Sequence, residues 1–244
     1  MRSLAARVAR FVGLALILAA ATTAVTAAAP VSTLADVTAS DVDASNAKVA
    51  MAYGALVEMW SGEYARIGQH FAAPHIARYR GNIMTDCGVM PANNALYCPQ
   101  RNTIYYDDIF VARQAKAASG QLGTDGDMAA VGIIAHEMGH AAAMQLGQDS
   151  RIPYENEAAA DCLAGAFARY SEKNGSLEKG DLEEAFFGLA AAGDPTPQYT
   201  GNRRIDNRIA VRAAYLGHGT RDQRLTNFTA GFKGGAGACL EVFR

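Results

Sequence analysis

The chain contains 244 residues, of which 50% are apolar and 19% charged, and its 22 Lys and Arg residues nearly balance its 24 Asp and Glu residues. This length fits one domain or two small ones and is sufficient for a substantial hydrophobic core. A formal net charge of −2 argues against nucleic acid as the main partner, and the apolar content excludes a disordered chain.

Residues 1–29 have the three parts of a secretory signal peptide. Three arginines precede a short apolar run, and small residues follow it up to Ala29. A retained membrane anchor is the alternative, but the apolar run, about residues 11–21, is shorter than the roughly 20 apolar residues that a bilayer span needs. We therefore expect cleavage near Ala29, export, and no membrane span in the mature protein.

The mature chain begins with residues 30–45, which are rich in Ser, Thr, Ala and Asp and are predicted to be flexible. Residues 46–244 contain no linker or internal repeat and are predicted to form one domain. Apolar residues recur at helical spacing over about residues 44–67. Residues 70–100 are interrupted by prolines and predict irregular structure. Residues 102–107 (NTIYYD) are β-branched and aromatic and predict a strand.

The remainder of the chain is predicted to be mostly helical. Residues 107–118 predict a short helix and residues 127–146 a longer one, with Asp127 as its N-cap. Further helices are predicted near residues 154–173, 180–192, 202–216 and 220–232. Thr220 and Gln223 have the spacing of a capping box at the start of the last of these. The predicted fold class is α+β, mainly helical, with a small β-sheet.

The four cysteines fit two disulfide bonds, since an even number of cysteines in an exported chain favours bridges. Cys87 and Cys98 flank a loop rich in turn-forming residues, so we pair these two. This leaves Cys162 to pair with Cys239. A cysteine zinc site is the weaker interpretation, because the chain contains no C-x-x-C motif.

His136-Glu137-Met138-Gly139-His140 is an H-E-x-x-H motif within a segment predicted to be helical. The two histidines are four residues apart, so both imidazoles project from one helix face and can bind a single Zn²⁺ ion. Glu137 can act as general base on a zinc-activated water and then protonate a leaving amine. Gly139 would let another segment approach the helix closely. A chance match on a buried helix is the alternative, but buried polar groups are costly without partners.

The next predicted helix offers a third ligand. Glu157 and Asp161 are four residues apart and share a face, so Glu157 can bind the metal while Asp161 orients a histidine. Glu155 is the competing ligand, but the helical period turns it away from Asp161 and no carboxylate follows it four residues on. Two histidines and one glutamate leave a fourth position open for water, as in catalytic zinc sites.

Other candidates lie outside these two helices. His218 could stabilise an oxyanion or hold Asp161, and the alternative is a histidine at a helix end that binds a carbonyl. Tyr105 and Tyr106 lie on the predicted strand. An edge strand beside the metal could bind extended substrate by β-augmentation, and one tyrosine could be a donor, although strand aromatics are more often part of the core.

The chain resembles a bacterial family of putative neutral zinc metallopeptidases in A-H-E-M-G-H and the following E-x-x-x-D-C-L-A-G-A-F. Further shared segments, over about residues 85–240, are C-G…Y-C-P-x-x-x-T-I-Y-Y-D at 87–107, G-D-L-E-E-A at 180–185 and H-G-T-x-x-Q-R…F-x-x-G-F at 218–232. The resemblance implies a zincin-like, gluzincin-like fold and zinc ligands at His136, His140 and Glu157. It also implies that Glu137 is the catalytic base. Ala141 departs from the histidine expected in many relatives, but it touches no predicted ligand.

These features together predict an exported zinc-dependent peptidase that hydrolyses peptide bonds, with Zn²⁺ as cofactor. Its substrates would be peptides or proteins, cell-wall peptides among the candidates, and its location would be secreted or in the cell envelope. The alternative is a zinc-stabilised extracellular binding or cell-surface protein with little or no turnover. The intact Glu137 favours the enzyme, because a structural zinc site needs ligands but no base.

Overall fold

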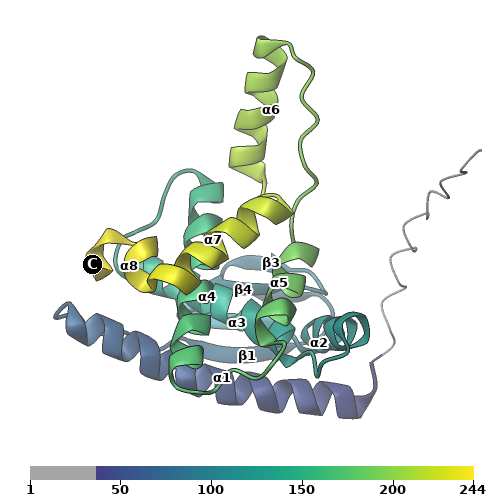
Figure 1. Ribbon diagram of the computed structural model, residues 1–244, viewed down its shortest axis with the longest axis vertical. Coiled ribbons are helices and arrows are strands. Elements are labelled where there is room, and N and C mark those ends of the chain that lie inside the picture. The colour runs from purple at the N-terminus through teal and green to yellow at the C-terminus, as the bar shows by residue number, and fades with distance from the viewer. Residues whose placement is uncertain (1–36) are drawn as a thin grey trace, which may run out of the picture. The chain divides into compact units, whose positions relative to one another are not determined.

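The computed structural model describes residues 37–244, except for the side chain of Leu216, and these residues pack around the central helix α3 (Asp127–Gln145). The predicted signal peptide, residues 1–29, lies outside the described residues. Apolar and small residues occur all around α3, and such a helix is typically buried on every side. Accordingly, helices α1, α2, α4 and α5 and strand β4 all pack against it (Figure 1).

The other helices are α1 (Ala39–Arg66), α2 (Asp108–Leu122), α4 (Pro153–Lys173), α5 (Asp181–Ala191), α6 (Arg203–Leu216), α7 (Arg221–Gly234) and α8 (Ala236–Cys239). The strands are β1 (His75–Tyr79), β2 (Ile83–Thr85), β3 (Gly88–Met90), β4 (Ala95–Cys98) and β5 (Thr103–Asp107). Single 3₁₀ turns occupy Pro99–Arg101 and Glu241–Phe243. The α+β, mainly helical fold class with a small sheet is confirmed (Figure 1).

The strands form two sheets, β1-β5-β4 and β2-β3, and they differ from the prediction in two respects. Four short strands, β1 to β4, lie in residues 70–100, a segment predicted to be irregular. Strands of three to five residues carry too little alternation to be recognised from the sequence. The predicted strand corresponds to β5, but β5 is central: it pairs with β1 in parallel and with β4 in antiparallel orientation. The edge beside α3 is therefore β4, and Tyr106 of β5 is buried in the core.

Helix α1 begins at Ala39, earlier than the sequence pattern indicated. Thr38 and Asp41 form a capping box, in which the Thr38 side chain accepts the Asp41 N–H and the Asp41 carboxylate accepts the Thr38 N–H. Residues 39–45, part of the segment predicted to be flexible, are consequently helical. The predicted capping box of Thr220 and Gln223 is present at the start of α7.

The N-cap predicted for α3 was wrong by one residue. Gly126 occupies that position with a φ of 81°, and Asp127 is the first helical residue. The cap comes instead from α5: the buried Glu184 carboxylate accepts the N–H groups of Gly126 and Met128, both at 2.9 Å. This contact fixes where the central helix starts.

Glycines bring the site-bearing helices into close contact. A Cβ at Gly139 of α3 would lie 2.9 Å from the Ala160 carbonyl oxygen of α4. A Cβ at Gly231 of α7 would lie 1.7 Å from the carbonyl oxygen of Cys162 in α4. Because real Cβ atoms cannot approach so closely, α4 can pack between α3 and α7 at this distance only with glycine at these positions.

Two disulfide bonds join the pairs expected from the sequence, Cys87 with Cys98 and Cys162 with Cys239. The first joins the turn between β2 and β3 to the end of β4, and the second ties α4 to α8. Disulfides of this kind persist in oxidising compartments outside the cytoplasm. Among the helices of residues 37–244, none has both the length and the hydropathy needed to cross a bilayer.

Loss of the Cys162–Cys239 bridge should destabilise the protein more than loss of the Cys87–Cys98 bridge. The two sequence separations are 77 and 11 residues, and a longer closed loop removes more entropy from the unfolded chain. We expect C162A/C239A to lower the free energy of unfolding by about 3–5 kcal/mol and C87A/C98A by about 2–3 kcal/mol. Urea denaturation followed by circular dichroism measures both. A larger loss for C87A/C98A would contradict this order.

Candidate metal centre

Three side chains from α3 and α4 bring their ligand atoms together. The Nε2 atoms of His136 and His140 are 3.1 Å apart. Glu157 places one carboxylate oxygen 3.2 Å from His136 Nε2 and the other 3.5 Å from His140 Nε2. Ligand atoms at 2.0–2.1 Å from a tetrahedral zinc ion would be about 3.3–3.4 Å from one another. The donor set therefore fits one zinc ion in both chemistry and spacing.

The charges around these donors favour a cation. Burial alone would lower the pKa of His136, but the hydrogen bond and negative charge of Asp161, with Glu157 and Glu137, raise it above its ordinary value. Burial would likewise raise the pKa of Glu157, but hydrogen bonds with His136 and His140 hold it well below its usual range. The three carboxylates of Glu137, Glu157 and Asp161 outnumber the single guanidinium of Arg224, an excess of negative charge that favours a bound cation.

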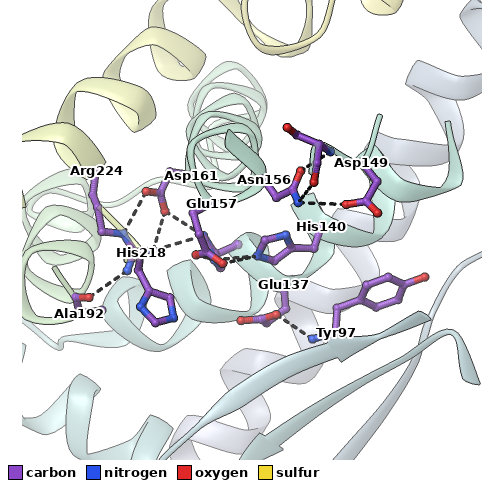
Figure 2. Close-up of polar contacts among 12 residues, drawn as sticks. Tyr97, Glu137, His140, Asp149, Asn156, Glu157, Asp161, Ala192, His218 and Arg224 are labelled. Atoms are coloured by element: carbon purple, nitrogen blue, oxygen red, sulfur yellow. Dashed lines mark hydrogen bonds and ion pairs between the residues drawn. The ribbon is translucent and has the colours of Figure 1, made fainter. Parts of the chain in front are cut away.

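Asp161 lies behind His136 and is fully buried. Its Oδ1 atom accepts the Nδ1–H of His136 at 2.8 Å, so the Nε2 atom of the same ring faces the other donors. Arg224 of α7 also holds this carboxylate, donating from Nε to Oδ2 at 3.0 Å and from Nη2 to Oδ1 at 2.6 Å (Figure 2). Such two-pronged charge-assisted hydrogen bonds fix the carboxylate plane and, through it, the imidazole.

Arg224 was not predicted from the sequence. Burial would lower its pKa, but Asp161 outweighs that effect and raises it. It also donates to the Ala192 carbonyl oxygen at 3.3 Å (Figure 2). The surrounding segment, R-D-Q-R-L-T-N, resembles an exposed helix start, so only its place in the H-G-T-x-x-Q-R segment signalled its importance.

Glu137 lies beside this centre and next to the sheet edge. Its side chain is buried, and one carboxylate oxygen accepts the Tyr97 N–H of β4 at 2.8 Å (Figure 2). Because alternate residues of a strand direct their backbone groups to the same edge, Ala95 also directs its N–H and C=O away from β5. Glu137 and Ala95 both line a cavity of about 330 Å³ in front of the histidines.

The remaining candidate residues, Glu155 and His218, lie in different places. Glu155 is exposed, and its carboxylate accepts the Ser150 hydroxyl, so of the two competing glutamates only Glu157 faces the histidines. His218 lines the same cavity as Glu137, with its Nδ1 atom 3.8 Å from Asp194. The expectation that His218 holds Asp161 was wrong, since Arg224 donates to that carboxylate and His218 lies beside Asp194.

A second acidic cluster, formed by Asp125, Asp127, Asp181 and Glu184, lies at the start of α3. Lys48 provides its positive charge, with Nζ 2.5 Å from Asp127 and 3.7 Å from Asp125. Glu184 binds the helix N–H groups described above. These contacts account for the cluster as a structural cap of α3.

Comparison with known proteins agrees with this arrangement. The chain matches the family described as "Putative neutral zinc metallopeptidase" over residues 4–243. It belongs to this family. It is also 31% identical to the uncharacterized protein YpfJ of Escherichia coli K12 and of E. coli O6:H1 strain CFT073, over 76% of this chain and 67% of each relative. No solved structure matches it.

Replacement of Arg224 by Met should lower the free energy of unfolding by about 3–5 kcal/mol, because it leaves the buried Asp161 carboxylate without its cationic partner. R101M is the matched control: it removes an exposed arginine that pairs with Asp86 at the surface, and should leave stability nearly unchanged. Chemical denaturation at neutral pH compares the two. Equal midpoints for R224M and R101M would show that Asp161 does not depend on Arg224.

Proposed function

We propose that the protein is an exported zinc-dependent peptidase, with His136, His140 and Glu157 as metal ligands and Glu137 as general base. The observation that carries the proposal is the triangle of donor atoms, with edges of 3.1, 3.2 and 3.5 Å, beside a carboxylate that lines the same cavity. Two histidines and one glutamate are typical of catalytic zinc sites. Membership of a neutral zinc metallopeptidase family supports the same conclusion.

Bound zinc would supply Lewis-acid chemistry, polarising the substrate carbonyl and lowering the pKa of water to about 7. Glu137 takes the proton from the attacking water and delivers it to the leaving amine, so that one carboxylate serves both halves of the hydrolysis. The Tyr97 N–H fixes one of its oxygens at 2.8 Å and thereby orients the carboxylate. A base held in this way requires little reorganisation during the reaction.

Two further groups support the reaction. Asp161 accepts the Nδ1–H of His136 and keeps that ring in the tautomer and orientation that metal binding requires. His218 lines the cavity beside Asp194 and donates to the oxygen that gains negative charge when the substrate carbonyl is attacked.

The substrate backbone would lie along β4. The outer edge of this strand is available at Ala95, beside the cavity, and an extended peptide can pair with such an edge. At Tyr97 the N–H is already bound to Glu137. Pairing along β4 would therefore stop next to the general base, which places a peptide bond there for attack.

Export is part of the proposal. Residues 1–29 would act as a cleaved signal peptide, and residues 46–244 would form the peptidase domain outside the cytoplasm, secreted or in the cell envelope. Two disulfides fit this location. Peptides and proteins found there, including the peptides of the cell wall, are the proposed substrates.

The first test is the E137Q variant. The zinc-loaded protein is incubated with an unbiased peptide mixture, and products are identified by mass spectrometry. We expect the parent protein to cleave peptides and E137Q to lose about 10²–10⁴-fold in rate while it keeps zinc, because the amide cannot take a proton. H140A should lose both zinc and cleavage.

Two outcomes would contradict the proposal. Full zinc occupancy in H140A would refute the ligand assignment. Tight zinc binding without cleavage by the parent, across the whole mixture and wall peptides, would instead favour the alternative of a zinc-stabilised binding protein.

The pair E157A and E155A tests the third ligand. Glu157 faces both histidines, whereas Glu155 points to Ser150 at the surface. Loss of a residue that only hydrogen-bonds to a metal ligand typically weakens metal binding by about 10–100-fold. E157A removes a ligand itself, so it should weaken zinc binding by at least this much. E155A should leave the affinity unchanged. Competition with a fluorescent zinc chelator measures both, and equal affinities for the two variants would refute the role of Glu157.

A further inference from the structure

We propose that the cavity in front of the metal centre selects substrates with a bulky apolar side chain next to the cleaved bond, and that Gly132 of α3 sets the size it admits. This inference rests on the proposed function and names the substrate class. It follows from three observations: the lining of the cavity, the space in front of Gly132, and the distribution of charge along the cavity walls.

The part of the cavity away from the histidines has apolar walls. They come from α2, α3 and α5 and consist of Phe110, Ala129, Ile133, Ala185 and Leu189. The alanines at 129 and 185 are buried and short, and the partly buried Phe110 and Ile133 face the open space. An apolar cavity of about 150 Å³ can hold a benzene molecule. The whole cavity measures about 330 Å³, so it can hold an aromatic side chain together with adjoining backbone.

Gly132 is a buried glycine in the middle of α3, where glycine costs about 1 kcal/mol relative to alanine. No close packing explains it, because a Cβ built on Gly132 would meet no atom within 4 Å. Gly188 of α5 differs: a Cβ there would lie 3.2 Å from the Ala129 carbonyl oxygen, so its glycine serves helix packing. A buried position with empty space in front of it faces a cavity, and Gly132 lies one turn before His136 on the same helix face.

Charge is confined to the metal end of the cavity. The charged or titratable side chains that line it are His136, Glu137, His140, Glu157, His218 and Arg224. Among the described residues that line the cavity, the other polar side chains are those of Asn93 and Asn94, next to β4. A charged substrate side chain in the apolar part would have no counter-ion among the residues that form this part, and an unpaired buried charge is strongly unfavourable. An apolar side chain would instead leave water for an apolar surface.

The test compares the full zinc-loaded chain with G132L and with the matched control G54L, which replaces an exposed α1 glycine that also has no atom within 4 Å of its Cβ position. The position that the pocket selects is first identified by mapping the products from a random peptide mixture. The substrates are then four peptides that differ only at this position, which is Phe, Leu, Ala or Asp. The parent should show at least about 10-fold higher kcat/KM for Phe and Leu than for Ala or Asp.

G132L should lose at least about 10-fold on the Phe peptide and change less than about 3-fold on the Ala peptide, because the leucine occupies the space that the substrate side chain needs. G54L should leave both values unchanged. Zinc affinity and thermal melting verify that G132L is folded, and G132A, with a smaller side chain, should fall between the parent and G132L. Equal cleavage of all four peptides by the parent, or an unchanged Phe preference in G132L, would overturn the proposal.

A binding measurement separates this inference from the proposed function. Isothermal titration of zinc-loaded E137Q with the Phe and Ala peptides should show tighter binding of the Phe peptide, and E137Q/G132L should lose the difference. If the parent cleaves no peptide, and the binding preference that depends on Gly132 is nevertheless present, the peptidase proposal fails and the pocket stands. If peptides are cleaved and both bind E137Q equally, the pocket fails and the peptidase stands.

Discussion

The site depends on one buried carboxylate. Asp161 is removed from water and accepts hydrogen bonds from His136 of α3 and from Arg224 of α7, so three helices meet at a single side chain. A buried charge is stable only when its partners are close and well aligned. The requirement to satisfy Asp161 therefore constrains the position of α7 relative to α4, and it links a segment near the C-terminus to the imidazole ring that faces the donor cluster.

Other features of the chain hold these helices together near Asp161. Gly231 lets α7 approach the Cys162 carbonyl of α4, one residue beyond Asp161, and Cys162 is itself bonded to Cys239. The close helix contact and the disulfide thus lie directly next to the buried charge. Because α4 cannot shift without disturbing both, Glu157, one turn earlier on the same helix, is held rigidly as well. Rigid placement of donors is what a metal site of defined geometry requires.

The parts of the site that could be predicted from the sequence are those set by local helical spacing. His136 and His140, and then Glu157 and Asp161, are each four residues apart, so their shared faces follow from the period of an α-helix without knowledge of the fold. Most helices were accessible for similar reasons, whereas the disulfide pairs followed from the turn-rich loop between Cys87 and Cys98, which left Cys162 to pair with Cys239. Arg224 was not, because its partner is 63 residues away and its burial depends on how α7 packs.

The errors in the fold have equally physical causes. The strands before β5 are short and partly exposed, so they carry little signal of their own; β1 and β4 form against β5, and β2 and β3 pair with each other. The central position of β5 is likewise a tertiary property, and it moved the edge beside α3 from the predicted strand to β4. The start of α1 was a different kind of miss: the Thr38 capping box was present in the sequence, but the surrounding small residues obscured it.

The spacing of residues along α3 connects the cavity, the donor cluster and the sheet edge. Residues 132, 136 and 140 follow one another at four-residue intervals on one face, so a single stripe of the helix runs from an open glycine through the two histidines. Glu137 is displaced from this stripe by one residue, toward β4, where the Tyr97 N–H binds it. A substrate lying between α3 and β4 would therefore meet the proposed side-chain pocket, the proposed metal ligands and the proposed general base in an order fixed by one helix. Because α1, α2, α4, α5 and β4 pack around α3, this order cannot change without repacking the core, so any selectivity of the site is built into the same element as its chemistry.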